Sequence, residues 1–359
     1  MEKKNLVIYQ IFVRNYSKEG TFKKVTEDLP RLKELGIDII YLTPIHEIGV
    51  ENRKGTWGSP YAIKDYFSIS PDLGTLGDFH ELVDKTHELG MKIILDMVFN
   101  HTSPDNVLID LHPEYYFYKN GKRGNRVGDW TDIVDLDTLR DDTQEYLLSV
   151  LKYWLNQKVD GFRFDVASTI PLSLFTKARE RFGNDFILYG ECVGEDFAKY
   201  LKSIDAVYVS DEDLMTAFNY LYNYNWLNQM ISYLKSEGKL ETVINNINSD
   251  TNTIFRVNCL ENHDKDRISS LTHNKEQLEN WIKFSFALKG HAFIYMGQEY
   301  GISHKPELFE KDPVIWPKEN EIYHLYKSLI KKKHASDIKD NELYIKDNIV
   351  YLNNIEYKL

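Results

Sequence analysis

One pattern constrains the fold of this chain more than any other: a helical run that ends near a glycine and leads into a short apolar run. Segments with this pattern include "LPRLKELGIDIIYL", "FHELVDKTHELGMKIILDMVF" and "LLSVLKYWLNQKVDGFRFDV". Glycine readily adopts the left-handed conformation that commonly ends a helix. The apolar runs are continuous rather than alternating, which is typical of parallel strands that helices cover on both faces.

The repeated pattern predicts eight strands, with helical runs between most of them. The predicted strands are residues 6–13, 37–42, 92–98, 160–165, 186–190, 205–209, 254–260 and 291–296. Eight β–α units favour an α/β fold of the closed (β/α)8 TIM barrel type over a doubly wound open sheet. The 359 residues fit one such barrel, because single barrels commonly exceed roughly 250 residues.

The segments between the strands differ greatly in length. We expect a catalytic barrel formed by residues 1–100 and 139–335, with a long loop at 43–77 after the second strand. Residues 101–138 form a small insertion domain after the third strand, and long irregular segments of this kind are usually functional. Residues 336–359 indicate a short, hairpin-like β tail that is too small for its own core and should pack against the barrel.

Composition limits the partners of the chain. A net charge of −11 argues against nucleic acid and anionic membrane surfaces. No apolar run approaches the roughly 20 residues that span a bilayer, and the N-terminal "LVIYQIFV" indicates a strand rather than a signal peptide. The two cysteines, Cys192 and Cys259, form no CxxC pair, which fits a reducing compartment. We therefore expect a cytoplasmic protein.

Charged and polar residues gather where the predicted strands end. Arg163 and Asp165 are two residues apart, so on an extended strand their side chains point the same way. Such residues are rarely buried without partners, and the carboxyl ends of barrel strands build active sites. Four predicted strands deliver to this mouth the residues Asp96, Asn100, His101, Arg163, Asp165, Glu191, His263 and Asp264.

The residue types at this mouth favour glycoside cleavage. The sequence contains no GxxxxGK[ST] phosphate loop, no GxGxxG at a first β–α turn, no GxSxG elbow, and no HExxH or cysteine cluster for a transition metal. Paired carboxylates remain, accompanied by arginine, histidine and aromatic loops. One carboxyl group can protonate a leaving oxygen while another meets the oxocarbenium-like carbon.

Four short motifs also occur in a characteristic order. "DMVFNH", "GFRFD", "GE" and "ENHD" resemble the four signature regions of the α-amylase family of glycoside hydrolases (family 13). "YLTPI", "GSPYAIKDYFSISPDLGT" and "YMGQE" are similar to further segments of that family. The resemblance extends from Tyr9 to about Gly301, and the ordered set is far more specific than any single motif.

The resemblance implies roles for the charged residues. Asp165 would be the nucleophile and Glu191 the general acid/base. Asp264 would be the third carboxylate, which holds sugar hydroxyls and favours ring distortion. Arg163 would hydrogen-bond the nucleophile and keep it ionised, and Asp96 would support Arg163 without taking part in the chemistry.

The resemblance also implies which residues bind the sugar. His101 and His263 would bind hydroxyls of the sugar at the cleaved bond, and Tyr61 would stack on that sugar. Trp57 and Trp130 are further candidates for stacking, because aromatic faces pack well on sugar rings.

These residues predict a retaining hydrolase of α-1,4-linked glucooligosaccharides that forms a covalent glycosyl-enzyme intermediate. The two catalytic carboxyl groups should then lie about 5–5.5 Å apart. An α-1,4-glucanotransferase with the same residues is the alternative, and a non-catalytic barrel that binds a glycan or a partner protein is a more remote one.

The chemistry itself requires no cofactor. Many relatives bind calcium between the barrel and the insertion, and Asn100 and Asp135 match two positions that supply oxygen ligands there. Calcium takes six to eight oxygen ligands, and the third matching position is Thr169 rather than His or Asn. A structural calcium ion is therefore not expected, although Asn100 and Asp135 remain its candidate ligands.

Overall fold

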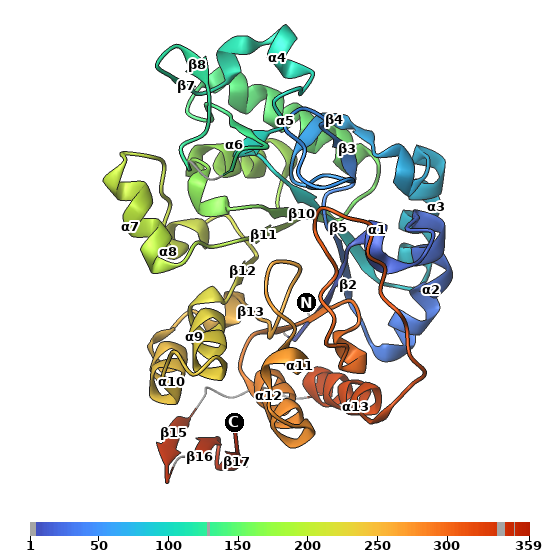
Figure 1. The fold of residues 1–359 in the computed structure, drawn as a ribbon, viewed down its shortest axis with the longest axis vertical. Coiled ribbons are helices and arrows are strands. Elements are labelled where there is room, and N and C mark those ends of the chain that lie inside the picture. The colour runs from blue at the N-terminus through green and yellow to red at the C-terminus, as the bar shows by residue number, and fades with distance from the viewer. Residues whose placement is uncertain (1–4, 128–129, 336–341, 348) are drawn as a thin grey trace.

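Residues 5–127, 130–335, 342–347 and 349–359 are described by the structure, a computed structural model. Within these residues, eight parallel strands close into a barrel in the order β1-β14-β13-β12-β11-β10-β5-β2, which confirms the predicted (β/α)8 fold (Figure 1). The strands are β1 (Val7–Ile11), β2 (Ile39–Leu42), β5 (Lys92–Met97), β10 (Gly161–Phe164), β11 (Ile187–Gly190), β12 (Tyr220–Tyr222), β13 (Arg256–Asn258) and β14 (His291–Tyr295). The predicted domain ranges also include residues 1–4, 128–129, 336–341 and 348, which lie outside the described residues.

Helices cover the outside of the barrel (Figure 1). The longer ones are α2 (Phe22–Leu35), α3 (Leu76–Glu88), α5 (Asp141–Asn156), α6 (Leu172–Phe182), α7 (Glu195–Ser203), α9 (Tyr224–Leu234), α10 (Leu240–Ser249), α12 (Lys275–Ala287) and α13 (Glu321–Ala335), and the single-turn ones are α1 (Val13–Tyr16), α4 (Leu108–Leu111), α8 (Asp211–Leu214) and α11 (Ile268–Leu271). Gly36 ends α2 as predicted, with a left-handed φ of 103° and an N–H that donates to the carbonyls of Leu32 and Lys33. Among the described helices, none is both long and apolar enough to cross a membrane.

The sixth strand is not where the sequence predicts it. Residues 205–209 form no strand, and the sixth barrel strand is Tyr220–Tyr222, which pairs with β11 and β13. The run "AVYVS" has strand propensity, but propensity depends strongly on context. The N–H of Val209 donates instead to the carbonyl of Ser168 (2.8 Å), in the loop after β10. A three-residue strand has too short a pattern to be recognised from sequence.

Both long segments at the barrel mouth contain short antiparallel strands. The pairs are β3 (His46–Ile48) with β4 (Ile63–Ile69), β6 (His101–Thr102) with β9 (Val134–Asp135), and β7 (Tyr118–Lys119) with β8 (Lys122–Arg123). The first pair follows β2, and the other two lie in the insertion after β5. Because β6 and β9 are the first and last strands of the insertion, their pairing holds its two ends together at the mouth.

The C-terminal segment forms three antiparallel strands: β15 (Leu343–Lys346), β16 (Ile349–Leu352) and β17 (Ile355–Tyr357). This small sheet lies beside α10 and α12 (Figure 1). Asn248 Nδ2 of α10 donates to the carbonyl of Leu343 (3.0 Å), and the rings of Phe284 and Tyr357 lie 5.4 Å apart. The sheet thus packs on barrel helices.

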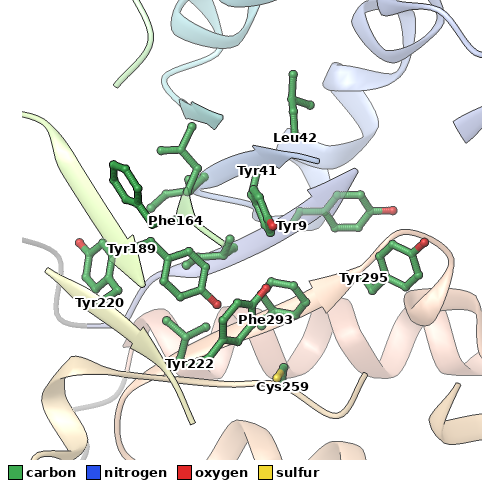
Figure 2. Packing of buried hydrophobic residues seen from close by; sticks show 14 of the residues in the cluster. Tyr9, Tyr41, Leu42, Phe164, Tyr189, Tyr220, Tyr222, Cys259, Phe293 and Tyr295 are labelled. Atoms are coloured by element: carbon green, nitrogen blue, oxygen red, sulfur yellow. The ribbon is translucent and has the colours of Figure 1, made fainter. Parts of the chain in front are cut away.

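Aromatic side chains fill the barrel below its mouth. Tyr41, Tyr189, Tyr222 and Phe293 come from four different strands, and their rings pack against one another at centroid distances of 4.6 to 6.4 Å (Figure 2). The guanidinium of Arg163 lies 5.9 Å from the ring centre of Tyr41 and 5.8 Å from that of Tyr222. Ring faces attract cations, so these two aromatic rings of the core stabilise the Arg163 guanidinium.

Candidate active site

Arg163 lies at the centre of a buried group of carboxylates. Its Nη1 donates to both oxygens of Asp96 (2.7 and 2.8 Å) and to Asp165 Oδ1 (3.0 Å). Its Nη2 lies 2.7 Å from Glu191 Oε2. Strand register brings these residues together, because Arg163 is paired with Asp96 of β5 and with Tyr189 of β11, two residues before Glu191. One cation therefore faces three carboxylates.

Burial shifts the pKa values of these carboxyl groups. Loss of hydration raises the pKa of Asp165 well above its usual range; Arg163 opposes this rise, and the negative charges of Glu191 and Asp96 add to it. Burial also raises the pKa of Asp96. Three carboxylates around one guanidinium leave an excess of negative charge. The hydrogen bond from Arg163 favours the ionised form of Asp165 against this excess, and a nucleophilic carboxylate requires that form.

Two further donors hold Glu191. The Val166 N–H donates to Oε2 (2.9 Å), and the Tyr224 hydroxyl donates to Oε1 (2.8 Å). Val166 has φ 38° and ψ 49°, a left-handed conformation that is strained for a β-branched residue. Because this turn follows Asp165 directly and aims its N–H at Glu191, it fixes the two carboxylates relative to each other.

Tyr61 links the carboxylates to the wall of the site. Its hydroxyl donates to Asp96 Oδ2 (2.9 Å), as does the hydroxyl of Tyr41 (2.6 Å). Its ring stacks on the ring of His263 at a centroid distance of 5.1 Å and an interplanar angle of 13°. Tyr61 is therefore held at both ends and has a fixed orientation.

The hydrogen bonds of His263 determine which ring nitrogen carries its proton. Gln10 Oε1 accepts the backbone N–H of His263 (3.3 Å), so Gln10 Nε2 faces His263 Nδ1 (2.8 Å) and donates to it. Burial lowers the pKa of His263 to about 3. The neutral ring thus carries its hydrogen on Nε2, which lies 3.2 Å from Asp264 Oδ2.

Asp264 and His101 complete the polar wall. The N–H of Asp264 donates to Asn262 Oδ1 (3.0 Å), while its side chain remains 45% exposed. Partial burial raises the pKa of Asp264. Burial lowers the pKa of His101 to about 4, so this ring is also neutral near pH 7 and can donate one hydrogen bond.

One pocket of about 500 Å³ joins these side chains. The predicted site residues that line it are Tyr61, His101, Asp165, Glu191, His263 and Asp264, and Arg163 and Asp96 are fully buried beside them. Trp130 also lines the pocket, 5.7 Å from the His101 ring. Trp57 does not line it and packs instead near Arg14, whose guanidinium lies 5.9 Å from its ring.

Comparison with known proteins agrees with this geometry. The sequence profile of the α-amylase catalytic domain matches residues 10–130, 127–216 and 172–347. The chain belongs to the α-amylase family.

Solved structures and curated proteins of this family are similar over most of the chain. An α-amylase from Lactobacillus plantarum is 38% identical, with a TM-score of 0.92 over 97% of this chain and 85% of that one. A noncanonic maltogenic α-amylase from Thermotoga neapolitana is 32% identical, with a TM-score of 0.86 over 98% of this chain and 83% of that one. A cyclomaltodextrinase from Thermoanaerobacter pseudethanolicus is 27% identical over 89% of this chain and 58% of its own length. The chain spans about half the length of the curated relatives it matches.

Sequence reasoning missed three residues of this α-amylase-family site: Tyr224, Gln10 and Val166. Tyr224 begins α9 within "YNYNWLNQM", a run that indicates helix packing and contains little to set one tyrosine apart. Gln10 had a visible signal, because it is a fully buried amide inside an otherwise apolar strand. The strain at Val166 is a backbone property that its residue type does not reveal.

The candidate calcium ligands in this α-amylase-family barrel do not form a suitable donor set. Asp135 Oδ2 accepts the N–H of Arg126 (2.8 Å) and its Nη1 (3.2 Å). The Thr169 hydroxyl donates to the carbonyl of Val166 (2.8 Å). Asp135 Oδ1 has no hydrogen-bond partner among the described residues, but the cavity that Asp135 and Asn100 line measures about 20 Å³, room for little more than one water. Calcium takes six to eight oxygens, and the one carboxylate here already pairs with a guanidinium.

Proposed function

We propose that this protein hydrolyses α-1,4-linked glucooligosaccharides with retention of anomeric configuration. The observation that carries this proposal is the placement of Asp165 and Glu191 on one guanidinium beside a single pocket. A retaining glycosidase needs one carboxylate as nucleophile and a second carboxyl group that exchanges a proton. Family relatives named α-amylase and cyclomaltodextrinase support an α-glucan substrate.

In the first step, Asp165 forms a bond to the anomeric carbon as the bond from that carbon to the glycosidic oxygen breaks. Glu191 transfers its proton to the departing oxygen, so the released sugar leaves as a neutral alcohol. Arg163 Nη1 stabilises the ionised form of Asp165 in this step, through the 3.0 Å hydrogen bond.

In the second step, water attacks the anomeric carbon and Glu191 takes up one proton from that water. Asp165 departs as a carboxylate, which Arg163 again stabilises. One glycosidic bond is cleaved and one water molecule is consumed, and the enzyme returns to its starting protonation state. The two carboxyl groups should lie about 5–5.5 Å apart for this double displacement.

The remaining pocket residues bind the sugar ring. His263 donates through Nε2, as its contact with Gln10 requires, and Asp264 accepts from sugar hydroxyls. His101 supplies a second neutral donor, and Tyr61 presents an aromatic face. Because both histidines are neutral near pH 7, neither adds a positive charge that would oppose an oxocarbenium-like transition state.

Transfer of the glycosyl unit to a sugar is the second candidate, since it needs the same residues with a sugar hydroxyl in place of water. A relative named α-1,4-glucan:maltose-1-phosphate maltosyltransferase, from Methylacidiphilum infernorum, supports it. That protein is 35% identical over 192 residues, which are 46% of this chain and 29% of its own length. Products longer than the starting oligosaccharide would identify transfer. The presence of all three carboxylates weighs against a non-catalytic binding barrel.

A cytoplasmic location belongs to the same proposal. Cys192 and Cys259 are buried free thiols, which fits a reducing compartment. An intracellular maltogenic amylase from Bacillus subtilis is 27% identical over 84% of this chain and 52% of its own length. The net charge of −11 favours neutral sugars over nucleic acid or anionic membranes as partners.

The test is turnover of maltotriose through maltoheptaose by the wild type and by Asp165→Ala, with the released anomer followed by NMR. We expect release of the α-anomer by the wild type and loss of turnover by several orders of magnitude in the variant. Release of the β-anomer would contradict the retaining mechanism. Absence of turnover on these substrates and on sucrose, trehalose and α-1,6-linked sugars would contradict the enzymatic proposal.

A further inference from the structure

The pocket has two halves that the strand order separates. Glu191 follows β11, which lies four strands from β1 in either direction around the eight-stranded barrel. The proposed proton donor therefore marks the side where the leaving sugar, the aglycone, departs. The retained sugar, the glycone, extends toward the opposite arc formed by β14, β1, β2 and β5. This assignment rests on the proposed function.

Loops from three of these strands meet on the glycone side. Residues 50–58 lie between β3 and β4 in the segment after β2, residues 131–133 belong to the insertion after β5, and residues 307–311 follow β14. All three loops contribute side chains to the pocket, namely Lys54, Asp132, Ile133, Leu308 and Phe309. We refer to these loops together as the three-loop wall.

An ion pair joins the first two loops. Lys54 Nζ lies 2.8 Å from Asp132 Oδ1, with the lysine side chain 35% exposed and the aspartate side chain 8% exposed. The same ammonium lies 5.8 Å from the ring centre of Phe309, within the range of a cation–π contact. Lys54 thus contacts the two other loops at once. Because Asp132 is largely withdrawn from water, its pairing is screened less than that of a surface pair.

Hydrogen bonds join the first and third loops. The N–H of Trp57 donates to the carbonyl of Phe309 (2.9 Å), and the N–H of Thr56 donates to Glu310 Oε1 (2.8 Å). Arg14 Nη1, buried beneath them, donates to the carbonyls of Gly58 (2.9 Å) and Leu308 (3.2 Å).

The close approach of these loops depends on Gly55. Its φ is +62°, and a Cβ atom there would lie 2.7 Å from Glu310 Oε1 and from the Phe309 backbone carbonyl oxygen. Only glycine fits this conformation and this spacing without displacing the third loop. The contact between the loops is therefore specified by the sequence at that position.

We propose that the three-loop wall ends the glycone side of the pocket, so that the enzyme acts from non-reducing chain ends and releases a short glycone of fixed length. The pocket volume of about 500 Å³ matches a small-molecule pocket of roughly 300–1,000 Å³ rather than a long groove. A glucan chain that continued past the wall would have to break the Lys54–Asp132 pair. Internal bonds of long chains are then poor substrates, and terminal ones are good substrates.

The test compares maltoheptaose with maltoheptaose whose non-reducing terminal glucose carries a 4,6-O-benzylidene group. We expect the wild type to cleave the blocked substrate at least 100-fold more slowly in kcat/KM. Lys54→Met and Asp132→Asn each break the ion pair from one side, so both should raise kcat/KM on the blocked substrate at least tenfold and release longer glycones. Lys64→Met is the matched control, because Lys64 pairs with Glu47 at 2.7 Å across β3 and β4, the strands that flank the first loop, and does not line the pocket.

The outcomes distinguish a failure of the three-loop wall proposal from a failure of the proposed hydrolase function. Equal turnover of both substrates by the wild type would overturn the wall while leaving the proposed hydrolase intact. If Lys54→Met and Asp132→Asn still cleave the blocked substrate much more slowly than the free one, and melt at temperatures close to that of Lys64→Met, the Lys54–Asp132 pair does not close the pocket. Turnover of neither substrate would overturn the proposed function, and the wall's role in specificity with it.

Discussion

Two buried arginines near the barrel mouth have opposite surroundings. Arg267 has one carboxylate partner, Glu261, at 2.6 Å from Nη1, and its Nη2 and Nε donate to the carbonyls of Met296 (2.9 Å) and His304 (3.0 Å). Arg163 faces three carboxylates, and its Nε has no hydrogen-bond partner among the described residues. The charge of Arg267 is balanced by one carboxylate and each of its three nitrogens donates a hydrogen bond, whereas Arg163 meets neither condition.

This comparison distinguishes an ion pair that only stabilises the fold from one that belongs to the proposed active site. Glu261 Oε2 also accepts the N–H of Ile268 (2.7 Å), so both carboxylate oxygens have partners, and neither Glu261 nor Arg267 lines the pocket. Burial raises the pKa of both Glu261 and Asp165, but only at Asp165 do two neighbouring carboxylates, Glu191 and Asp96, add to the rise. Asp165 and Glu191 also line the pocket, where their carboxylate oxygens can meet a ligand. Unbalanced buried charge lowers the stability of the fold. Such charge is typical of active sites, because catalysis requires groups with shifted pKa values.

The largest expected effect is that of Asp165→Asn. This isosteric change should lower kcat by about 10⁴-fold or more, because the proposed nucleophile is lost. A raised folded-state pKa means that ionised Asp165 destabilises the fold at neutral pH, so the neutral amide should leave the melting temperature unchanged or raise it. Kinetics with maltotriose and a thermal melt at pH 7 check both parts. A marked fall in melting temperature would show that Asp165 is structural, like Glu261.

Arg267→Met should show the reverse pattern. Removal of one partner leaves Glu261 buried and unpaired, which should lower the free energy of unfolding by about 3–5 kcal/mol. The loss in kcat should be far smaller than for Asp165→Asn, since Arg267 does not line the pocket. Urea unfolding and steady-state kinetics on the same preparation check this. The double variant Glu261→Met with Arg267→Met should recover more than half of the lost stability, and no recovery would contradict the charge-balance argument.

Tyr224→Phe tests the hydrogen bond from an uncharged side chain to Glu191, one of the three carboxylates around Arg163. It removes the 2.8 Å hydrogen bond to Glu191 Oε1, and bonds to charged groups contribute about 1.5–3 kcal/mol. We expect kcat to fall by about tenfold or somewhat more, with little change in KM. Tyr233→Phe is the control on the same helix, because its hydroxyl donates to the carbonyl of Leu359, at the C-terminal sheet. Equal effects of the two substitutions would show that α9 tolerates neither change and that Glu191 is not involved.

Much of this cluster could be predicted from sequence, because it depends on strand periodicity. Arg163 and Asp165 share a side through the two-residue repeat of a strand, and Asp96 and Glu191 stand at the ends of neighbouring strands. Tyr224 could not be predicted in this way, since its contact depends on where α9 starts after a three-residue strand. The pairing of Arg126 with Asp135 likewise depends on how the insertion folds back, which no local pattern encodes.

His46 provides a smaller effect away from the cluster. Its ring is buried against Trp154 (5.3 Å), and neither ring nitrogen has a hydrogen-bond partner among the described residues. Burial lowers its pKa to about 3, so below pH 6.5 the unfolded chain gains a proton that the folded protein does not. Stability is therefore lost as pH falls from 6.5 toward 3, and at pH 5.5 the loss from His46 alone is about 1 kcal/mol.

His46→Phe should remove that part of the acid sensitivity. We expect the fall in unfolding free energy between pH 7.5 and pH 5.5 to be about 1 kcal/mol smaller in the variant. His101 and His263 should retain their share, because burial lowers their pKa values as well. Urea titrations at the two pH values give the comparison, and an identical fall in both proteins would show that His46 is not neutral in the fold.

The smallest expected effect is that of a chelator. Asp135 is balanced by Arg126, whose guanidinium also lies 4.2 Å from the Phe117 ring centre, so this carboxylate already has a cation within the insertion. EDTA and added calcium should therefore leave the melting temperature of the wild type unchanged.

Arg126→Met should lower the free energy of unfolding by about 1–3 kcal/mol, because it leaves a buried carboxylate unpaired. Arg123→Met, an exposed change in the same insertion, should have little effect. A fall in wild-type melting temperature with EDTA that calcium reverses would contradict the expected absence of a chelator effect, because the fold would then depend on a bound metal ion.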